Sequence, residues 1–382
     1  MSAVAAFYTP LKHPDEREPS GDRQIARALV TGLEGCGFAP ELASRLTVWR
    51  RQFDAAEAER VERRAALVGH LLVRRYRRRP PATRPRLWVT YQNYHRCPDF
   101  VGPAVATALD VPYVLVDTAV STKSRRTPFR PWASAARLAV RRADLIFAMS
   151  PRDLPRLRAI RGPRFAATRL RLLPPAVDPA VFAGNHGART RHQAALTRRL
   201  AATEGPILLC VAMMRQADKL DSYRLLAAAL GRIRAPWRLA VVGDGPARGA
   251  VETAFASLPA ERIAWLGAMA PDELPPLYLG ADLFAFPGLG EALGLVYLEA
   301  AAAGLPVVAC AGPGPQAMVA PDGGLLTAPT PTAFADGLAA LLTDPARRAA
   351  MGAAARRFVA TERNVAGFAR ALGDGLALLQ LP

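Results

Sequence analysis

Residues 237–258, WRLAVVGDGPARGAVETAFASL, combine three features that decide the fold of this chain. The run LAVV is apolar at every position, as in a strand buried on both faces of a sheet. Gly243 and Gly245 follow it and indicate a tight turn, and ARGAVETAFASL then reads as a helix. A buried strand, a glycine turn and a helix together predict one step of a parallel α/β sheet.

The same alternation extends outward from this stretch in both directions. Further strands of the second half are predicted at 206–213, 263–267, 282–287 and 305–312, with helices between them. The first half repeats the scheme less clearly, with strands at 86–92, 111–117 and 145–150. We therefore expect two doubly wound, Rossmann-like α/β domains, at 1–195 and 196–360, whose ligands bind at the carboxyl ends of the strands. The proline-rich segment 171–182 indicates the connection between them.

The basic charge of the chain lies in its first half. The formal net charge is +18, and residues 1–200 contain 36 Lys or Arg against 16 Asp or Glu, whereas the remainder contains 14 against 16. This asymmetry favours an anionic partner for the first half, such as a phosphorylated lipid, an acidic glycan or nucleic acid. The alternative is a solvated, arginine-rich surface without a ligand.

A basic amphipathic helix is predicted at 61–79. Its apolar stripe comprises Val61, Ala65, Val68, Leu72 and Tyr76, and arginines occupy the other positions. Two readings stay open: the helix lies on an anionic membrane through 61–86, or it packs its stripe on the core. No signal peptide or membrane-spanning run is evident, and the four cysteines are scattered, so we expect a cytoplasmic protein, possibly peripheral on the inner face of the cell membrane.

Two glutamates, Glu291 and Glu299, stand eight positions apart in the apolar stretch GEALGLVYLEAAAAG. Glu291 is expected in the loop after a strand and Glu299 in the next helix. If all intervening residues were helical, the carboxylates would lie roughly 12 Å apart along the axis, which suits an elongated polar ligand better than a shared metal. Gly290 and Gly294 allow close approach of the backbone, and the amides of Gly294 and Leu295 would face an anion.

These motifs resemble those of the retaining glycosyltransferases of family 4. GEALGLVYLE is similar to their E-x7-E signature and VVGDGPAR to their V-G-x-G-P-x-R turn, and the likeness runs through about 205–360. The resemblance implies a GT-B fold of two facing Rossmann-like domains, with a nucleotide-sugar donor bound by the second domain and an acceptor by the first. It also implies that no metal or other cofactor is needed and that 361–382 crosses back to the first domain.

The resemblance assigns roles in the second domain. Arg215 and Lys219 would clamp the diphosphate, Glu291 would hold the donor sugar and Glu299 the ribose; retention would need no protein nucleophile. This chain departs from the family's pattern in two ways. Three residues separate Arg215 from Lys219, where the family usually has four, and Leu220 follows the lysine, where the family usually has glycine. The predicted donor-binding residues are Gly243, Gly245, Trp265, Leu266, Glu291, Ala292, Leu293, Gly294, Leu295 and Glu299.

The first domain offers fewer motifs. Ser20, Gly21, Asp22 and Arg23 precede a helix and are predicted to cap it and to contact phosphate or acceptor. His95 and Asp117 each follow a strand and are candidate catalytic auxiliaries, although a lone histidine also suits a packed structural position.

Together these features predict a hexosyltransferase that uses a UDP- or GDP-sugar and an anionic or membrane-associated acceptor, such as a lipid, lipopolysaccharide or other cell-envelope glycan. An inactive relative that binds sugar nucleotides or glycans is the first alternative. A basic nucleic-acid-binding protein is less favoured, because no aromatic-interleaved basic motif occurs. An oxidoreductase is disfavoured, because GDGPARG follows the second strand of its domain and not the first.

Overall fold

The computed structural model describes residues 2–16, 20–120, 127–160, 169–184, 186–201 and 204–380. The chain forms two compact units, one of Met1–Pro175 with Val365–Pro382 and one of Ala176–Asn364. The boundary thus lies at 175/176 and not at the expected 195/196. Residues 176–195 group with the second unit because α6 (His186–Thr197) packs against α9 (Pro275–Gly280), where Arg189 and Gln193 donate hydrogen bonds to Asp282.

Unit 1 is built on a six-stranded parallel sheet of order β2-β1-β3-β4-β5-β6. Its strands are β1 (Ala3–Tyr8), β2 (Phe38–Ser44), β3 (Pro85–Asn93), β4 (Tyr113–Thr118), β5 (Leu145–Ala148) and β6 (Leu170–Leu172). Its helices are α1 (Gly21–Gly35), α2 (Ala55–Arg77), α3 (Gly102–Leu109), α4 (Arg130–Arg142), α5 (Leu154–Arg158) and α14 (Val365–Ala377), with short 3-10 turns η1 (Pro81–Thr83) and η3 (Pro151–Asp153).

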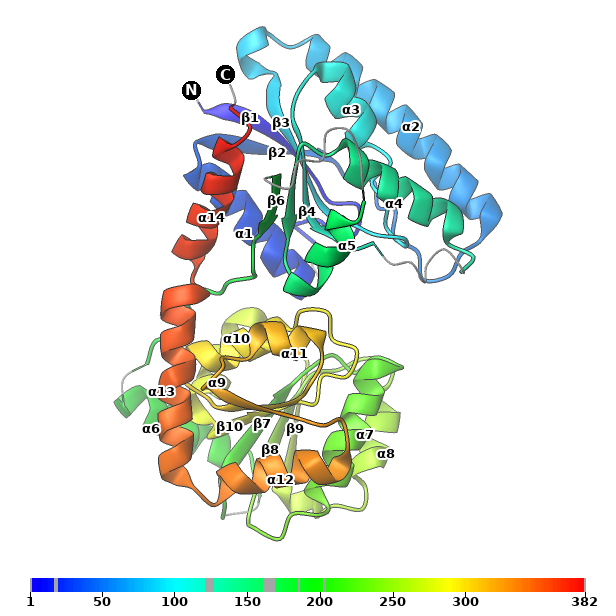
Figure 1. The fold of residues 1–382 in the computed structure, drawn as a ribbon. Helices are drawn as coiled ribbons and strands as arrows, with labels where there is room; N and C mark the ends of the chain where they lie inside the picture. The colour runs from blue at the N-terminus through cyan, green and yellow to red at the C-terminus, as the bar shows by residue number, and fades with distance from the viewer. Residues whose placement is uncertain are drawn as a thin grey trace. The chain divides into compact units, whose positions relative to one another are not determined.

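Helices cover both faces of this sheet (Figure 1). Successive side chains of a strand point to opposite faces. On β5, Ile146 and Ala148 join the core cluster beneath α2, α3 and α4, whereas the Phe147 ring lies against Gly375 of α14. Helix α14 also packs on α1, where a Cβ at Gly32 would lie 2.9 Å from Leu372. The end of the chain is therefore part of the core of unit 1.

Unit 2 contains a second six-stranded parallel sheet, of order β12-β11-β10-β7-β8-β9. Its strands are β7 (Ile207–Val211), β8 (Arg238–Val242), β9 (Ile263–Gly267), β10 (Leu283–Ala285), β11 (Val307–Cys310) and β12 (Gly324–Thr327). Helices α7 (Asp218–Leu230), α8 (Arg248–Phe255) and α12 (Pro331–Leu342) pack together (Figure 1). A second group is centred on α10 (Leu295–Ala302), which contacts α9, α11 (Pro313–Met318) and α13 (Pro345–Glu362). The remaining turns are η5 (Pro179–Phe182), η6 (Ala260–Arg262) and η7 (Pro271–Glu273).

Helix α2 decides between the two readings of the basic amphipathic segment. Val61, Ala65, Leu72 and Tyr76 are all buried in the core of unit 1, and Val68 packs against the same cluster. Arg75 and Arg79, on the outer side, form ion pairs of 2.6 Å with Glu41. The prediction that this stripe lies on a membrane is therefore wrong, because the sheet already covers it. Among the described residues, no helix is long and apolar enough to span a bilayer.

Candidate functional site

In unit 2 the chain reverses its direction of travel across the sheet between β7 and β10. Strands β8 and β9 lie beyond β7 on one side, and β11 and β12 lie beyond β10 on the other. Ligands of doubly wound sheets bind at such a switch point, outside the carboxyl ends of the strands. The loops that follow β7 and β10, at 212–217 and 286–294, therefore form the candidate donor site.

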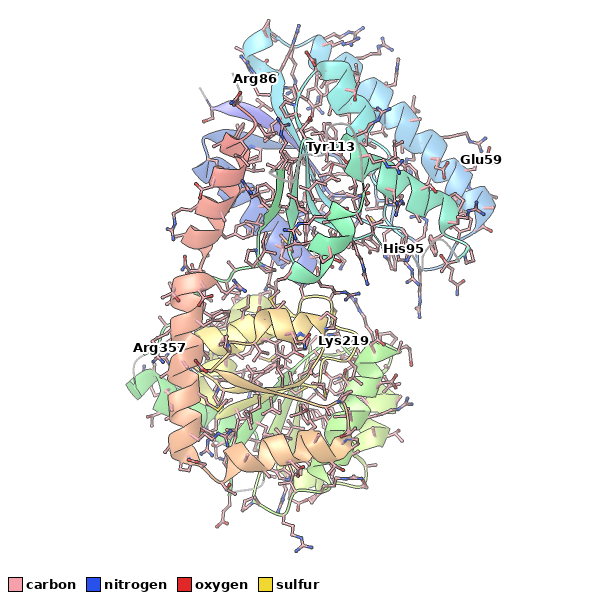
Figure 2. The ribbon with its side chains drawn as sticks, in the orientation of Figure 1. Glu59, Arg86, His95, Tyr113, Lys219 and Arg357 are labelled. Atoms are coloured by element: carbon pink, nitrogen blue, oxygen red, sulfur yellow. The ribbon has the colours of Figure 1, made fainter. Side chains whose placement is uncertain are left out.

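An ion pair joins these two loops. Lys219, in the first turn of α7 (Figure 2), pairs through Nζ with Oε2 of Glu291, and the ammonium lies 4.9 Å from the centre of the Phe286 ring. The Lys219 and Glu291 side chains are 25% and 18% exposed, so both groups remain within reach of a ligand. The structure thus brings together two of the predicted site residues, which are 72 positions apart in sequence.

Glycines hold the neighbouring loops in their close packing. Gly243 and Gly245 have φ values of 142° and 150°, and a Cβ on either would overlap a main-chain carbonyl of the loop after β7. Three main-chain hydrogen bonds tie these loops: Met214 N to Asp244 O at 2.9 Å, Ala247 N to Met214 O at 2.9 Å and Gly243 N to Gly267 O at 2.8 Å. The exposed Arg215 lies on the loop after β7 that these bonds hold.

Helix α10 begins where the sequence predicts, with Glu291 in the loop before it and Glu299 within it. Gly294, with φ 80°, is its N-cap, and the helix runs from Leu295, so Glu291 and the partly accessible Ala292 and Leu293 are in the preceding loop. The axial separation expected for an all-helical segment does not apply. No side-chain hydrogen bond caps α10 among the described residues, which leaves its first turn suited to an anion.

Glu299 is more enclosed than the prediction of a ribose contact implies. It is only 6% exposed, and Tyr278 Oη donates a hydrogen bond of 2.8 Å to its Oε2. Burial, and then the charge of Glu299, raise the pKa of Tyr278 well above its usual value. Trp265, on β9, packs edge-on against Phe255 at 5.5 Å between ring centres, and Leu266 beside it is half-buried. Ligand contacts of these three residues stay predictions.

Unit 1 has its own switch point, between β1 and β3. Ser20 caps α1 by accepting a hydrogen bond from Arg23 N, and Arg23 Nη1 donates to Glu16 O at 2.7 Å. Asp22, one residue after Gly21 in the first turn of α1, accepts a hydrogen bond of 2.8 Å from Gln92 Nε2 at the end of β3. The side chain of Asp22 is thus engaged with β3, and its charge disfavours phosphate at this position.

Asp117 lies near Asp22, at the end of β4. It is half-buried and has φ 56°, and burial, followed by the charges of Asp22 and Asp153, raises its pKa to about 7, while a hydrogen bond from Gln92 opposes the shift. The sequence had suggested Asp22 and Asp117 separately and did not suggest Gln92 or Asp153. The signal for both was available, because Gln92 is the last residue of the strand predicted at 86–92 and Asp153 closely follows the strand predicted at 145–150.

His95 lies among aromatic rings. Its ring packs edge-on against those of Tyr94 and Phe129, each at 5.9 Å between centres, and burial together with the charge of Arg96 lowers its pKa. This packing matches the structural reading of a lone histidine, and a catalytic role stays a prediction. In the described part of the chain, no three His, Cys, Asp or Glu side chains are grouped so as to hold a metal ion.

Comparison with known proteins bears mainly on unit 2. Residues 205–344 match the family described as Glycosyl transferases group 1. The chain is 36% identical over 203 residues to a D-inositol 3-phosphate glycosyltransferase of Salinispora tropica, covering 50% of this chain and 42% of the relative. It is 33% identical over 237 residues to a GDP-mannose-dependent alpha-(1-6)-phosphatidylinositol monomannoside mannosyltransferase of Mycolicibacterium smegmatis, covering 58% and 60%. The alignments thus span about half the length of these relatives.

Solved structures match over almost the whole chain. A sucrose-phosphate synthase from Thermosynechococcus elongatus superposes with a TM-score of 0.75 at 19% identity, over 99% of each chain. Anabaena HepE, in a complex with UDP-glucose, superposes with a TM-score of 0.71 at 16% identity, over 98% of this chain and 99% of HepE. At such identities the likeness shows the fold. Residues 205–344 therefore match the group 1 glycosyltransferase family, in a chain that has the GT-B fold.

Proposed function

We propose that the protein is a retaining glycosyltransferase of family 4, which transfers a hexosyl group from a UDP- or GDP-sugar to an anionic or membrane-associated acceptor. The observation that carries the proposal is the Lys219–Glu291 pair at the switch point of unit 2, inside the segment that matches the family. A diphosphate requires a cation and close main-chain approach, and a sugar ring requires hydrogen-bond acceptors. Lys219, the glycine loops and Glu291 offer these three features side by side.

The proposed reaction needs no covalent enzyme intermediate. The acceptor oxygen forms a bond to the anomeric carbon as the bond from that carbon to the diphosphate breaks, and the acceptor proton passes to the leaving diphosphate oxygen. Lys219 and Arg215 would stabilise the charge that grows on the diphosphate, the kind of interaction that contributes most to catalysis. Glu291 would orient the sugar through its hydroxyls while it holds the Lys219 ammonium in place. No metal or bound cofactor enters this scheme.

The names of two relatives support the choice of substrates. One is named for GDP-mannose and a phosphatidylinositol mannoside, and the other for inositol 3-phosphate. Among the structural neighbours, HepE binds UDP-glucose. Both sequence relatives are named for an inositol that carries a phosphate group, and one of them is also named for a nucleotide-sugar donor. These names support a nucleotide sugar and a hydroxyl-bearing acceptor with an anionic group.

A thermal-shift screen with UDP-, GDP- and ADP-sugars tests the donor assignment. A ligand at a hundred times its Kd stabilises a protein by about 2.7 kcal/mol, so one of these sugars should raise the Tm clearly. Lys219→Ala should abolish most of the shift. Arg224→Ala removes a cation from the same helix, 58% exposed and paired with Asp221, and should leave the shift unchanged. If no nucleotide sugar stabilised the wild-type protein, the proposal would be wrong, and an inactive relative that binds a glycan in place of a sugar nucleotide would replace it.

Peripheral membrane contact through 61–86 requires a different surface from the one first expected. Leu67 and Leu71 are 59% and 50% exposed and one turn apart on α2, among arginines of its outer side. We propose that they, and not the buried stripe, contact an anionic membrane. Sedimentation with phosphatidylglycerol vesicles should weaken at least fivefold in the Leu67→Ser, Leu71→Ser variant, and equal binding to pure phosphatidylcholine vesicles would contradict the idea.

A further inference from the structure

The switch point of unit 1 carries a group of polar side chains that the donor site does not explain. Asp22 comes from the first turn of α1, Tyr91 and Gln92 from the end of β3, and Asp117 from the end of β4. The neighbouring strands β1 and β3 connect to opposite sides of the sheet. This is the position at which a doubly wound sheet binds its ligand.

Gln92 lies at the centre of the group. It is 4% exposed, donates a hydrogen bond of 2.8 Å to Asp22 Oδ1, and also bonds the Asp117 carboxyl group. Its Oε1, in contrast, has no hydrogen-bond partner in the described part of the chain. Buried carbonyl oxygens are almost always paired in folded proteins. The unpaired oxygen is therefore available to accept a hydrogen bond from a ligand.

Tyr91 supplies a second unsatisfied group. Its side chain is completely buried, and its hydroxyl also lacks a partner among the residues described. Burial raises the pKa of Tyr91 well above its usual value, and the charges of Asp22 and Asp117 raise it further, which places this ring close to both carboxyl groups. The hydroxyl therefore stays protonated and is able to donate to a ligand oxygen as well as to accept.

The available hydrogen-bonding groups define the ligand chemistry. Asp22, Asp117 and the Gln92 oxygen all accept hydrogen bonds, and Asp153, which follows β5, adds a third negative charge nearby. Phosphate carries between one and two negative charges near neutral pH and would be repelled by these carboxylates. A ring with adjacent hydroxyls donates hydrogen bonds to several acceptors at once and can accept a hydrogen bond from the Tyr91 hydroxyl.

Resting on the proposed function, we propose that Asp22, Tyr91, Gln92 and Asp117 bind the hydroxyl-bearing ring of the acceptor, a sugar or cyclitol, through neighbouring hydroxyl groups. An anionic group on the same acceptor is held away from these residues. The left-handed backbone at Gln92 and Asp117, with φ of 75° and 56°, aims both side chains from strand ends and fits a site held in a fixed geometry.

Ligand-observed NMR on the full-length protein tests the site without a donor. The probes are myo-inositol, methyl α-mannopyranoside and inorganic phosphate. We expect at least one ring to bind the wild-type protein, phosphate not to compete with it, and Asp117→Asn and Gln92→Leu to weaken the binding at least tenfold. Asp110→Asn alters an exposed carboxylate at the end of α3 and should have no effect.

Binding of the nucleotide sugar is measured in a separate experiment, so that a failure of this inference can be distinguished from a failure of the proposed function. The Kd of the nucleotide sugar should be the same in the wild-type protein, Asp117→Asn and Gln92→Leu, which also shows that the variants are folded. Unchanged ring binding in both variants, ring binding by neither probe, or displacement of a bound ring by phosphate would overturn this inference. Loss of donor binding by the wild-type protein would instead overturn the proposed function.

Discussion

The two switch points of this protein share a geometry and differ in charge. In unit 2 the loops at the switch point bring a lysine against a glutamate, and the neighbouring Gly243 and Gly245 lie close against the main chain of the loop after β7. In unit 1 the equivalent place brings a glutamine between two aspartates, and in the described part of the chain the buried oxygens of Gln92 and Tyr91 there have no hydrogen-bond partner. The first arrangement suits a phosphate next to a sugar, and the second suits hydroxyl groups alone.

The difference also shows where the basic residues of the first half do not lie. The net positive charge of residues 1–200 suggests an anion at the heart of unit 1, yet its switch point is acidic. Arginines instead lie on the outer sides of helices such as α2, where Glu41 pairs with Arg75 of the helix and with Arg79 just after it. Net charge therefore describes the surface of a domain and not the chemistry of its ligand site.

The largest expected effect comes from breaking the glycine loops of unit 2. Gly243→Ala places a Cβ on the carbonyl oxygen of Ala212 at a φ of 142°, so it should lower the free energy of unfolding by about 3 kcal/mol or more. Gly249→Ala is the matched control, since its Cβ meets nothing within 4 Å, and it should stabilise α8 by up to about 1 kcal/mol. Urea denaturation measures both, and equal losses would refute the steric account.

A smaller effect is expected from the acidic group of unit 1 and depends on pH. Because the pKa of Asp117 is raised to about 7 in the folded state, the native protein keeps a proton that the unfolded chain releases above pH ~4. The free energy of unfolding therefore falls as pH rises toward 7 and then levels off. Asp117→Asn removes this dependence.

The measurement is the stability of the two proteins at pH 5 and pH 8. Relative to the wild-type protein, Asp117→Asn should gain about 1–2 kcal/mol between these values, since one pKa unit corresponds to about 1.4 kcal/mol and partial exposure reduces the full effect. Asp110→Asn should show no such gain. A constant difference between Asp117→Asn and the wild-type protein would mean that Asp117 is ionised throughout.

The smallest expected effect concerns Ala217, the residue before α7. Its φ of 63° is unfavourable for a side chain and is one of the few such values in the described chain. Ala217→Gly should relieve this strain and raise the free energy of unfolding by about 1 kcal/mol. Since Lys219 follows closely, the same variant should weaken donor binding if the strain serves to position the ammonium. Chemical denaturation and nucleotide titration separate the two effects.

The sequence predicted the second sheet more completely than the first. Strands β7, β8 and β9 fall within the predicted apolar runs, since their residues are almost all aliphatic. In unit 1, β1 and β2 gave no comparable signal: AVAAFY is rich in alanine, which has a low strand propensity, and FAPELAS carries a proline at an edge. Their identity as strands depends on pairing with β3 and with each other.

The same contrast holds for the sites. The sequence was enough to predict that Lys219 and Glu291 follow strands of a doubly wound sheet, because ligands of such sheets bind at the strand ends. That Glu299 is bonded by Tyr278 was not, because nothing local links positions 21 residues apart. The unpaired oxygen of Gln92 was also inaccessible, since burial of one side-chain atom depends on helices and strands that fold around it.

Hydrogen–deuterium exchange with UDP or GDP tests most directly whether the two switch points differ in ligand chemistry. The account predicts that the nucleotide slows exchange in peptides covering 212–219 and 286–298 and leaves those covering 20–24 and 90–94 unchanged. Slower exchange confined to the peptides of unit 1 would contradict the assignment of the nucleotide to the Lys219–Glu291 site and, with it, the contrast between the two units.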